Sequence, residues 1–458
     1  MAIDSLRLGD STRIKQVRHR GGIRQTPSRW LVAVGALLLI VSASAARAQQ
    51  YQADEVDEDA GRLKLTAEQC VKNPARFPSD RARFFEFFEK YYFPAMTRFS
   101  PKDLGELGPM RDYLFERIIW ASKDENLQRE LTQMAFTKLK PVVYNQGKNY
   151  HPATRYNAVL ILGMLDETYP GAGRPPVPLK EAAADLTRIV DAAAEGKRVP
   201  PFLVVGALVG IERHAKSIDK LDRSTGEAMA AAVLKLATKE GALTEADSTV
   251  MEWIRIQADS ALATIGSPGA NGEVAAAFEK MIAGKTDPKM SLDGRSRVAA
   301  MLPQLKLDGA KVDSKALADS LLELTTAVAD NEAKEAKAFT NMSIGGGGFG
   351  YSGGGSGKSD RMRLDPETQE WSFDKRILLS RLSDLKLGLD ACKPVAPADS
   401  QPTLDEVLAA INATITTAES PNSTDIKVSG SVEQMQKKIR AAVKPGELAP
   451  DDSDANLF

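Results

Sequence analysis

The chain has 458 residues with 60 basic and 61 acidic side chains, so its net charge is close to zero. Residues 1–48 hold eight of the basic and two of the acidic residues, which leaves the remainder clearly acidic. An acidic chain argues against nucleic acid or anionic lipid as a partner. The remaining length of about 410 residues can bury a large core, in one elongated domain or in two to three compact ones.

Residues 1–48 have the order of a secretory signal peptide. A positively charged segment precedes an apolar run at 30–41, and Ala46 and Ala48 place small residues where a signal peptidase cleaves. The run is shorter than the roughly 20 residues of a spanning helix. We therefore expect an exported protein, periplasmic or extracellular. If the run extends through Ala46, an uncleaved N-terminal membrane anchor is the alternative.

Residues 49–79 form a polar leader, whose acidic first part, 49–62, predicts disorder. A helix with an aromatic face is expected next. Its aromatic residues, spaced to share one helix face, are Phe84, Phe85, Phe88, Tyr91 and Tyr92. This face has two interpretations: a docking surface for a partner or membrane, or a helix packed on the first repeat. We favour packing, because such a stripe usually belongs to a core.

Amphipathic helical patterns then follow one another with turn signals between them, and no strand-like alternation interrupts them. The predicted helices are 108–121, 126–140, 152–166, 180–195, 201–216, 224–239, 248–265, 271–284, 293–306 and 313–337. The segments are rich in Ala, Leu, Lys and Glu, which are strong helix formers. We therefore predict an all-α fold, with one helical repeat domain spanning 80–340.

Related segments recur at fixed register within this region. The positions of Arg155, Ala158, Leu162 and Leu165 recur at three later places, one of which has lost the arginine. They recur as Arg255, Ala258, Leu262 and Ile265, as Arg295, Val298, Leu302 and Leu305, and as Val204, Ala207, Ile211 and His214. Shifts of 40 to 51 residues between copies bracket a two-helix unit.

The segment from Pro152 through Arg155, Ala158, Leu162 and Gly163 resembles the second helix of a HEAT or armadillo-type repeat. The resemblance covers about residues 105–340. It implies an α-solenoid, a right-handed stack of antiparallel helix pairs that binds on one curved face, and it implies no reaction.

In that family the matching arginine often braces the neighbouring repeat, so Arg155, Arg255 and Arg295 are expected to be structural. His214 is expected at the repeat surface. Pro303 replaces the glycine of the last copy and predicts a kink or an early helix end.

The last third of the chain changes character. Residues 343–359 contain nine glycines, so we expect a linker or exposed loop at 341–365. Short helices are predicted at 374–389, 404–417 and 432–443, within a small helical region at 366–445. An acidic, disordered tail is expected at 446–458.

Two glycine-rich matches to catalytic motifs carry little weight. Residues 352–359 approach a phosphate-binding loop, and Gly350, Ser352 and Gly354 fit the pattern of a serine nucleophile. Both motifs need a strand before them and a helix after them, and neither is predicted here. His151 and His214, the two histidines after residue 48, are too far apart in sequence to suggest a metal site.

The two cysteines leave one structural question open. Export makes a disulfide between Cys70 and Cys392 chemically feasible, whereas the simpler interpretation is two buried small side chains.

The sequence as a whole favours a non-enzymatic scaffold without cofactor or metal that binds a protein partner or itself. Two alternatives stay open: an envelope protein held at the membrane by its N-terminus, and an enzyme or enzyme subunit with a site in the C-terminal part. Membrane contact is expected only if the N-terminal segment is retained.

Overall fold

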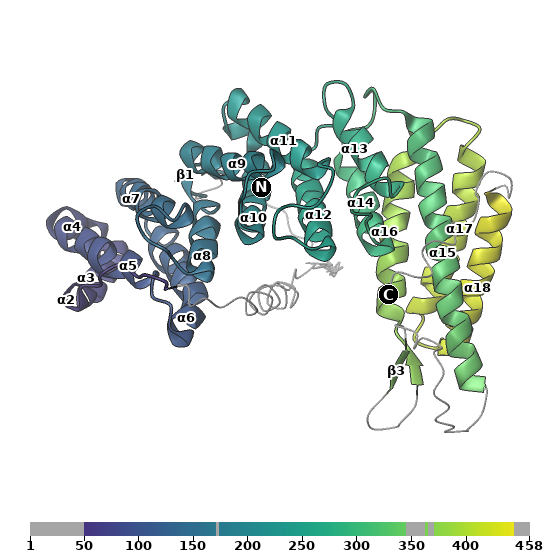
Figure 1. Ribbon diagram of the computed structural model, residues 1–458, viewed down its shortest axis with the longest axis horizontal. Coiled ribbons are helices and arrows are strands. Elements are labelled where there is room, and N and C mark those ends of the chain that lie inside the picture. Colours follow the sequence, from purple (N-terminus) through teal and green to yellow (C-terminus); the bar gives the residue numbers. More distant parts are fainter. Residues whose placement is uncertain (1–49, 171–173, 345–361, 365–370, 444–458) are drawn as a thin grey trace, which may run out of the picture. The chain divides into compact units, whose positions relative to one another are not determined.

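Helices make up most of the chain that the structure describes, as the sequence predicts (Figure 1). The structure is a computed structural model and describes residues 50–170, 174–344, 362–364 and 371–443. Within these ranges two short antiparallel strand pairs occur. They are β1 (Asp166–Thr168) with β2 (Val177–Pro178), and β3 (Met362–Leu364) with β4 (Trp371–Phe373).

Several expectations lie outside the described residues. They concern the signal peptide, almost all of the glycine-rich segment with Ser352, and the acidic tail. Residues 51–458 form one unit, which is distinct from residues 1–50. No helix among the described residues is both long and apolar enough to cross a membrane.

The N-terminal elements include two π-helical turns. They follow the order α2 (Glu58–Gly61), α3 (Lys64–Lys72), η2 (Pro74–Arg76), α4 (Phe77–Glu86), η3 (Phe87–Tyr92), α5 (Phe93–Ala95), α6 (Pro101–Asp112) and η4 (Tyr113–Ile119). The turns η3 and η4 are the π-helical ones, with backbone hydrogen bonds that skip one residue more than in an α-helix. The aromatic stripe is mostly core: Phe84, Phe88 and Tyr92 are buried.

The acidic leader is ordered from Tyr51 onward, which differs from the predicted disorder. Its Asp54 carboxylate accepts hydrogen bonds from Lys148 Nζ (2.6 Å) and the Tyr150 hydroxyl (3.0 Å). The Asp54 amide donates to the Thr97 hydroxyl (2.7 Å). These partners lie 43 to 96 residues away, so local composition could not reveal them.

Helices α7 to α14 form four successive pairs close to the predicted positions. Their bounds are α7 Glu125–Val143, α8 Pro152–Leu162, α9 Lys180–Ala194, α10 Pro201–Ala215, α11 Arg223–Ala237, α12 Ser248–Ile265, α13 Glu273–Ile282 and α14 Leu292–Met301. Within each pair the two helices pack on each other. Helices α8, α10, α12 and α14 also pack successively in one row, and α9, α11 and α13 pack in a second row (Figure 1).

Local sequence signals fix where these helices begin and end. The side chains of Asp124, Asp247 and Ser291 accept backbone hydrogen bonds at the first turns of α7, α12 and α14. Gly266 ends α12 in the left-handed region at φ 73°. Helix α14 ends at Met301 and a 3₁₀ turn follows around Pro303, which confirms the predicted early end.

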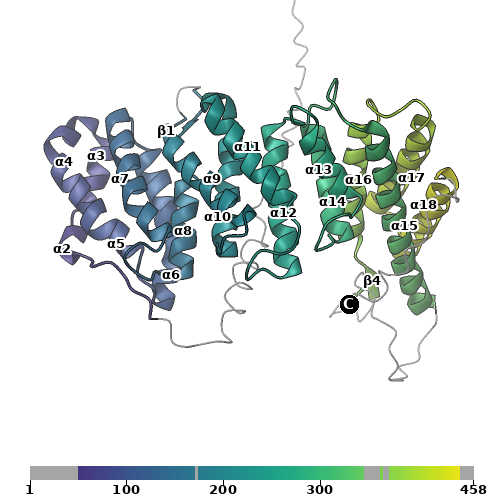
Figure 2. The ribbon, with the colours of Figure 1, turned by 45° about the horizontal axis from the view of Figure 1, so that its top comes forward.

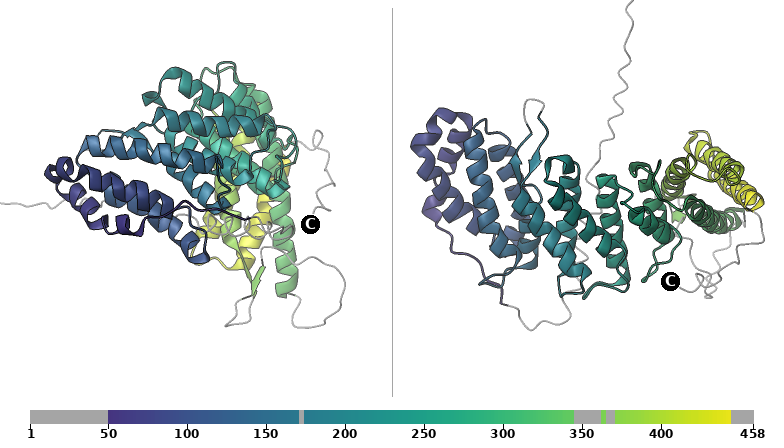
Figure 3. Two further views of the ribbon diagram at one scale, coloured as in Figure 1. Left: turned by 60° about the vertical axis from the view of Figure 1, so that its left-hand side comes forward. Right: turned by 90° about the horizontal axis from the view of Figure 1, so that it is seen from above.

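The C-terminal part is a four-helix bundle, and its boundary differs from the predicted one. The helices are α15 (Ser314–Ile344), α16 (Lys375–Cys392), α17 (Gln401–Glu419) and α18 (Asp425–Ala442). Helix α15 packs on both α16 and α18, and α17 packs on both α16 and α18, which closes the ring (Figures 2 and 3). The predicted boundary near 340 would therefore separate α15 from the helices that cover it.

Candidate functional site

The arginines at the repeat position cap helices. Arg155, on α8, donates from Nε and Nη2 to the carbonyl oxygen of Val143 (3.1 and 2.9 Å), the last residue of α7. Arg295, on α14, donates from Nε to the carbonyl oxygen of Ile282 (2.8 Å), the last residue of α13. The last carbonyls of a helix lack intrahelical partners, so each arginine satisfies an orphan acceptor and opposes the negative end of the dipole.

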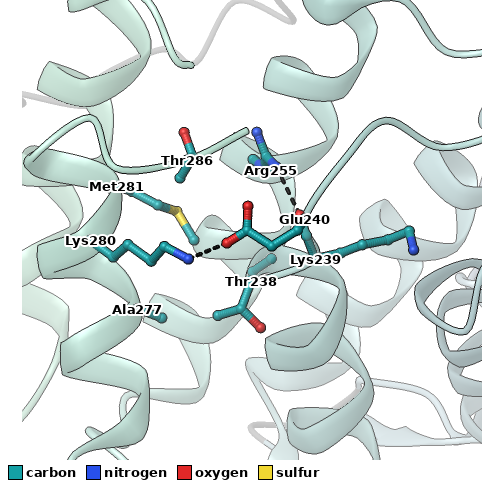
Figure 4. A pocket seen from close by; sticks show the side chains of 9 residues that line it. Thr238, Lys239, Glu240, Arg255, Ala277, Lys280, Met281 and Thr286 are labelled. Atoms are coloured by element: carbon teal, nitrogen blue, oxygen red, sulfur yellow. Dashed lines mark hydrogen bonds and ion pairs between the residues drawn. The ribbon is translucent and has the colours of Figure 1, made fainter. Parts of the chain in front are cut away.

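Arg255 makes the equivalent contact on α12 and is almost fully buried. Its Nη2 donates to the carbonyl oxygen of Lys239 (2.8 Å), just past the end of α11 (Figure 4). Beside it, Lys280 forms an ion pair with Glu240. The pocket drawn there holds about 10 Å³, enough for roughly one water molecule, and is not a ligand site.

These contacts lie mainly within a helix pair. The family resemblance implied bracing of the neighbouring repeat by these arginines. Two of them also reach the next pair: Arg155 lies over the Phe202 ring of α10 (5.6 Å), and Arg255 donates to the carbonyl oxygens of Asp287 and Pro288 in the loop between α13 and α14.

The remaining repeat positions lie in the core. Ala158, Leu162, Ala258, Leu262 and Leu302 are all buried. At Gly163 the backbones of α8 and α10 meet, because a Cβ atom there would lie 2.5 Å from the Cα atom of Gly210. Glycine is needed at this position for close approach, since its φ of −66° suits any residue.

His214 corrects an expectation, because it is fully buried and not a surface residue. Burial lowers the pKa of its imidazole to about 3, and the neighbouring Arg213 adds to the shift. The ring is therefore neutral at ordinary pH. Asp259 on α12 is also fully buried, and burial raises the pKa of its carboxyl well above the usual range. Neither side chain lines the small pocket beside Arg255 or a larger pocket among the N-terminal elements.

The cysteines are free thiols, so the structure has no Cys70–Cys392 disulfide. Both side chains are fully buried, on α3 and at the end of α16. Helix α3 packs on α4, whereas α16 packs on α14, α15 and α17, so the two thiols belong to different parts of the core. Burial raises the pKa of Cys392 to about 12 and also raises the pKa of Cys70, which makes both thiols poor nucleophiles.

The strongest candidate for a binding site is a pocket of about 440 Å³ among the N-terminal elements. Its volume falls within the range of ligand sites. One wall is aromatic, made by Phe87, Tyr91, Tyr92 and Tyr113. Three of these residues belong to η3 and the fourth begins η4, so both π-helical turns supply the wall. Such turns are rare and often mark functional sites.

The aromatic wall is fixed by packing and hydrogen bonds. The rings of Phe87 and Tyr91 stack at 5.7 Å with an interplanar angle of 24°, and those of Tyr92 and Tyr113 lie 5.7 Å apart. The Tyr92 hydroxyl donates to the carbonyl oxygen of Met110. Burial raises the pKa values of Tyr92 and Tyr113 well above the usual range, so both phenols stay neutral.

The other walls carry charges of both signs. Their polar residues are Lys64 from α3, Arg98 after α5, and Asp103 and Glu106 on successive turns of α6. Lys64 Nζ lies 4.8 Å from the centre of the Tyr113 ring, which is a cation–π contact. Arg98 forms an ion pair with Glu58, so its charge is already compensated.

Sequence reasoning singled out Tyr91 and Tyr92 but missed the pocket they border. The residues Lys64, Asp103, Glu106 and Tyr113 carry no motif. They come from three elements, α3, α6 and η4, that tertiary packing brings together, and the 3.6-residue period of a single helix cannot reveal such packing.

The groups that line the pocket are ones that can bind a ligand. The pocket offers aromatic faces and carboxylates but no nucleophile paired with a base. Across the described ranges no group of three or more His, Cys, Asp or Glu side chains is arranged to hold a metal ion. No family model matches the chain, and no curated protein and no solved structure shows significant similarity to it.

Proposed function

We propose that this protein is a non-enzymatic, exported scaffold of HEAT-like helix pairs that binds a protein partner through its N-terminal tyrosine-lined pocket. The observation that carries the proposal is the open pocket of about 440 Å³, whose aromatic wall is held rigid before any ligand arrives. Preformed walls reduce the ordering cost of binding.

The repeat part of the proposal is supported by the arginine contacts. Arg155, Arg255 and Arg295 stand at the same register and each caps the first helix of its own pair. Two rows of helices, each packed on the next, are what an α-solenoid requires. In such an array the repeats supply a frame, and a partner binds where side chains are left accessible.

The proposal is tested by site-specific photocrosslinking in the cells that produce the protein. A benzophenone amino acid replaces Glu106 at the pocket, and a second variant carries it at the exposed Glu181 of α9 as the matched control. We expect one defined adduct from position 106 and none from 181. The adduct should disappear when Tyr91→Ser is added, while the circular dichroism spectrum stays unchanged.

Equal adducts from both positions, or an adduct that survives Tyr91→Ser, would contradict pocket binding. An adduct with the same mass as a second copy of this chain would identify self-association, the other form of partner that the proposal includes. The alternative of an envelope protein held at the membrane depends on whether the N-terminal segment is retained.

A further inference from the structure

We propose that the tyrosine-lined pocket recognises an organic cation, either a lysine or arginine side chain or a small quaternary ammonium ion. The inference deepens the proposed function, on which it rests for the location of the site. Three features of the pocket carry it: a cation already seated on one ring, two carboxylates without a cationic partner, and rings held in place.

The seated cation is Lys64 of this same chain. Its Nζ lies 4.8 Å from the centre of the Tyr113 ring, within the range of a cation–π contact. Lys64 is exposed, so its ammonium group is held loosely. A ligand cation that makes additional contacts could displace it. We regard Lys64 as an internal occupant whose position marks where a ligand charge would lie.

The carboxylates are Asp103 and Glu106, three residues apart on α6. Both line the pocket, and within the described ranges no basic side chain lies within ion-pair distance of either. Arg98 lines the same pocket but is engaged with Glu58. The charges left without an ion-pair partner are therefore two negative and one positive, and the positive one is the displaceable Lys64. The balance favours a positive ligand.

The rings are fixed where a cation needs them. Tyr91 lies against Gly61, since a Cβ atom at that glycine would come within 2.7 Å of the Tyr91 ring. Tyr91 also stacks on Phe87. Because the negative faces of aromatic rings attract cations, rings that need no rearrangement strengthen the binding of a positive group.

Saccharides also stack on tyrosine rings, and they are the main competing ligand class. A sugar ring uses aromatic faces and hydrogen bonds, and it has no need of a net negative pocket. The seated ammonium and the two uncompensated carboxylates therefore favour the cation.

The test measures the NMR signal of the Met110 methyl group, because Met110 lines the pocket. The full protein is labelled at its methionine methyl groups, and Met110→Leu assigns the signal. The probes are tetramethylammonium chloride and three short peptides that differ in one central residue, which is lysine, norleucine or glutamate. Chitobiose serves as the saccharide probe, and sodium chloride at equal ionic strength is the blank.

We expect the lysine peptide or tetramethylammonium to shift the Met110 signal, with the norleucine and glutamate peptides binding at least about tenfold more weakly. Lys64→Met removes the internal competitor and should strengthen cation binding by roughly three- to tenfold. Lys72→Met, at an exposed lysine near the end of the same helix, should leave the affinity unchanged. Glu106→Gln and Tyr113→Leu should each weaken cation binding.

Several outcomes would overturn the inference. They are equal affinity for the lysine and norleucine peptides, preference for the glutamate peptide or chitobiose, weaker cation binding by Lys64→Met, and no shift with any probe. If tetramethylammonium binds and the lysine peptide does not, the pocket recognises a cation as inferred. The proposed function, in which the pocket binds a protein partner, is then refuted. If the norleucine peptide binds as tightly as the lysine peptide, the pocket still binds peptides and the proposed function stands. Only the inferred preference for a cation is then refuted.

Discussion

At the scale of single residues, the conspicuous side chains of the repeat serve packing and helix ends. Gly163 shows this for packing, because α8 and α10 approach so closely there that a methyl group would strike the Gly210 backbone. The sequence identifies Gly163 as a repeat position. Glycine is needed there because the two helices lie too close together for a larger residue. That distance cannot be read from one helix alone.

Gly163→Ala should therefore destabilise the protein by about 1–3 kcal/mol, the usual cost of inserting a methyl group into a filled core. The midpoint of urea unfolding measures the change. Gly430→Ala is the matched control, since Gly430 is also helical but its added methyl group meets nothing within 4 Å. The control should gain up to about 1 kcal/mol from its better helix propensity. Equal midpoints for the two variants would contradict the backbone contact.

The candidate site also belongs to this scale, and little of it could be predicted. The aromatic stripe was visible in the sequence, and its assignment to the core holds for Phe84, Phe88 and Tyr92. Tyr113, Lys64 and the α6 carboxylates come from separate elements with no shared pattern. Their convergence depends on tertiary packing, and the π-helical backbone at Tyr113 departs from the 3.6-residue period on which sequence prediction relies.

At the scale of elements, the sequence located the helices well and their partners less well. Apolar periodicity shows which face of a helix is buried, so α7 to α18 lie near their predicted positions. It does not show what covers that face. Helix α15 was therefore assigned to the repeats, although it packs on α16 and α18 in the bundle as well as on α13 and α14.

The junction between α14 and α16 carries charges that should make stability depend on pH. Arg381 of α16 pairs with Glu332 of α15 (2.7 Å) and with Asp293 of α14. Asp384, one turn further along α16, is half-buried, and burial raises the pKa of its carboxyl to about 6. Arg297 opposes the shift and Asp293 adds to it.

A raised carboxyl pKa means that the folded protein favours the protonated form of Asp384. Its contribution to stability is complete below about pH 4 and is lost as the pH rises through about 6. Asp384→Asn should therefore match the parent protein at pH 4. At pH 7 it should be more stable by up to about 1–2 kcal/mol, allowing for partial exposure. Thermal unfolding of both proteins across this range measures the difference.

The control for this prediction is Asp390→Asn, an exposed acid on the same helix that pairs with Lys386. Its stability relative to the parent should not grow between pH 4 and pH 7. A constant difference between Asp384→Asn and the parent across the whole range would show that Asp384 does not titrate near pH 6 in the folded protein.

At the scale of the whole molecule, the scaffold and the membrane-held alternative differ in one segment, the N-terminal 48 residues. The described fold begins almost directly after that segment. The ring of Tyr51 lies 4.7 Å from that of His151 and 6.1 Å from that of Phe99, and the following residues are tied to the body through Asp54. A chain cut after Ala48 would thus retain the contacts of Tyr51 and Asp54.

We therefore expect the exported protein to begin at Gln49, and intact-mass measurement together with N-terminal sequencing checks this. Ala48→Phe places a large residue where a signal peptidase needs a small one, so it should block processing and keep the protein with the membrane fraction. Arg47→Gln, at the tolerant position beside it, should be processed normally. If the natural protein instead keeps residues 30–41 and sediments with membranes, the membrane-held alternative is correct.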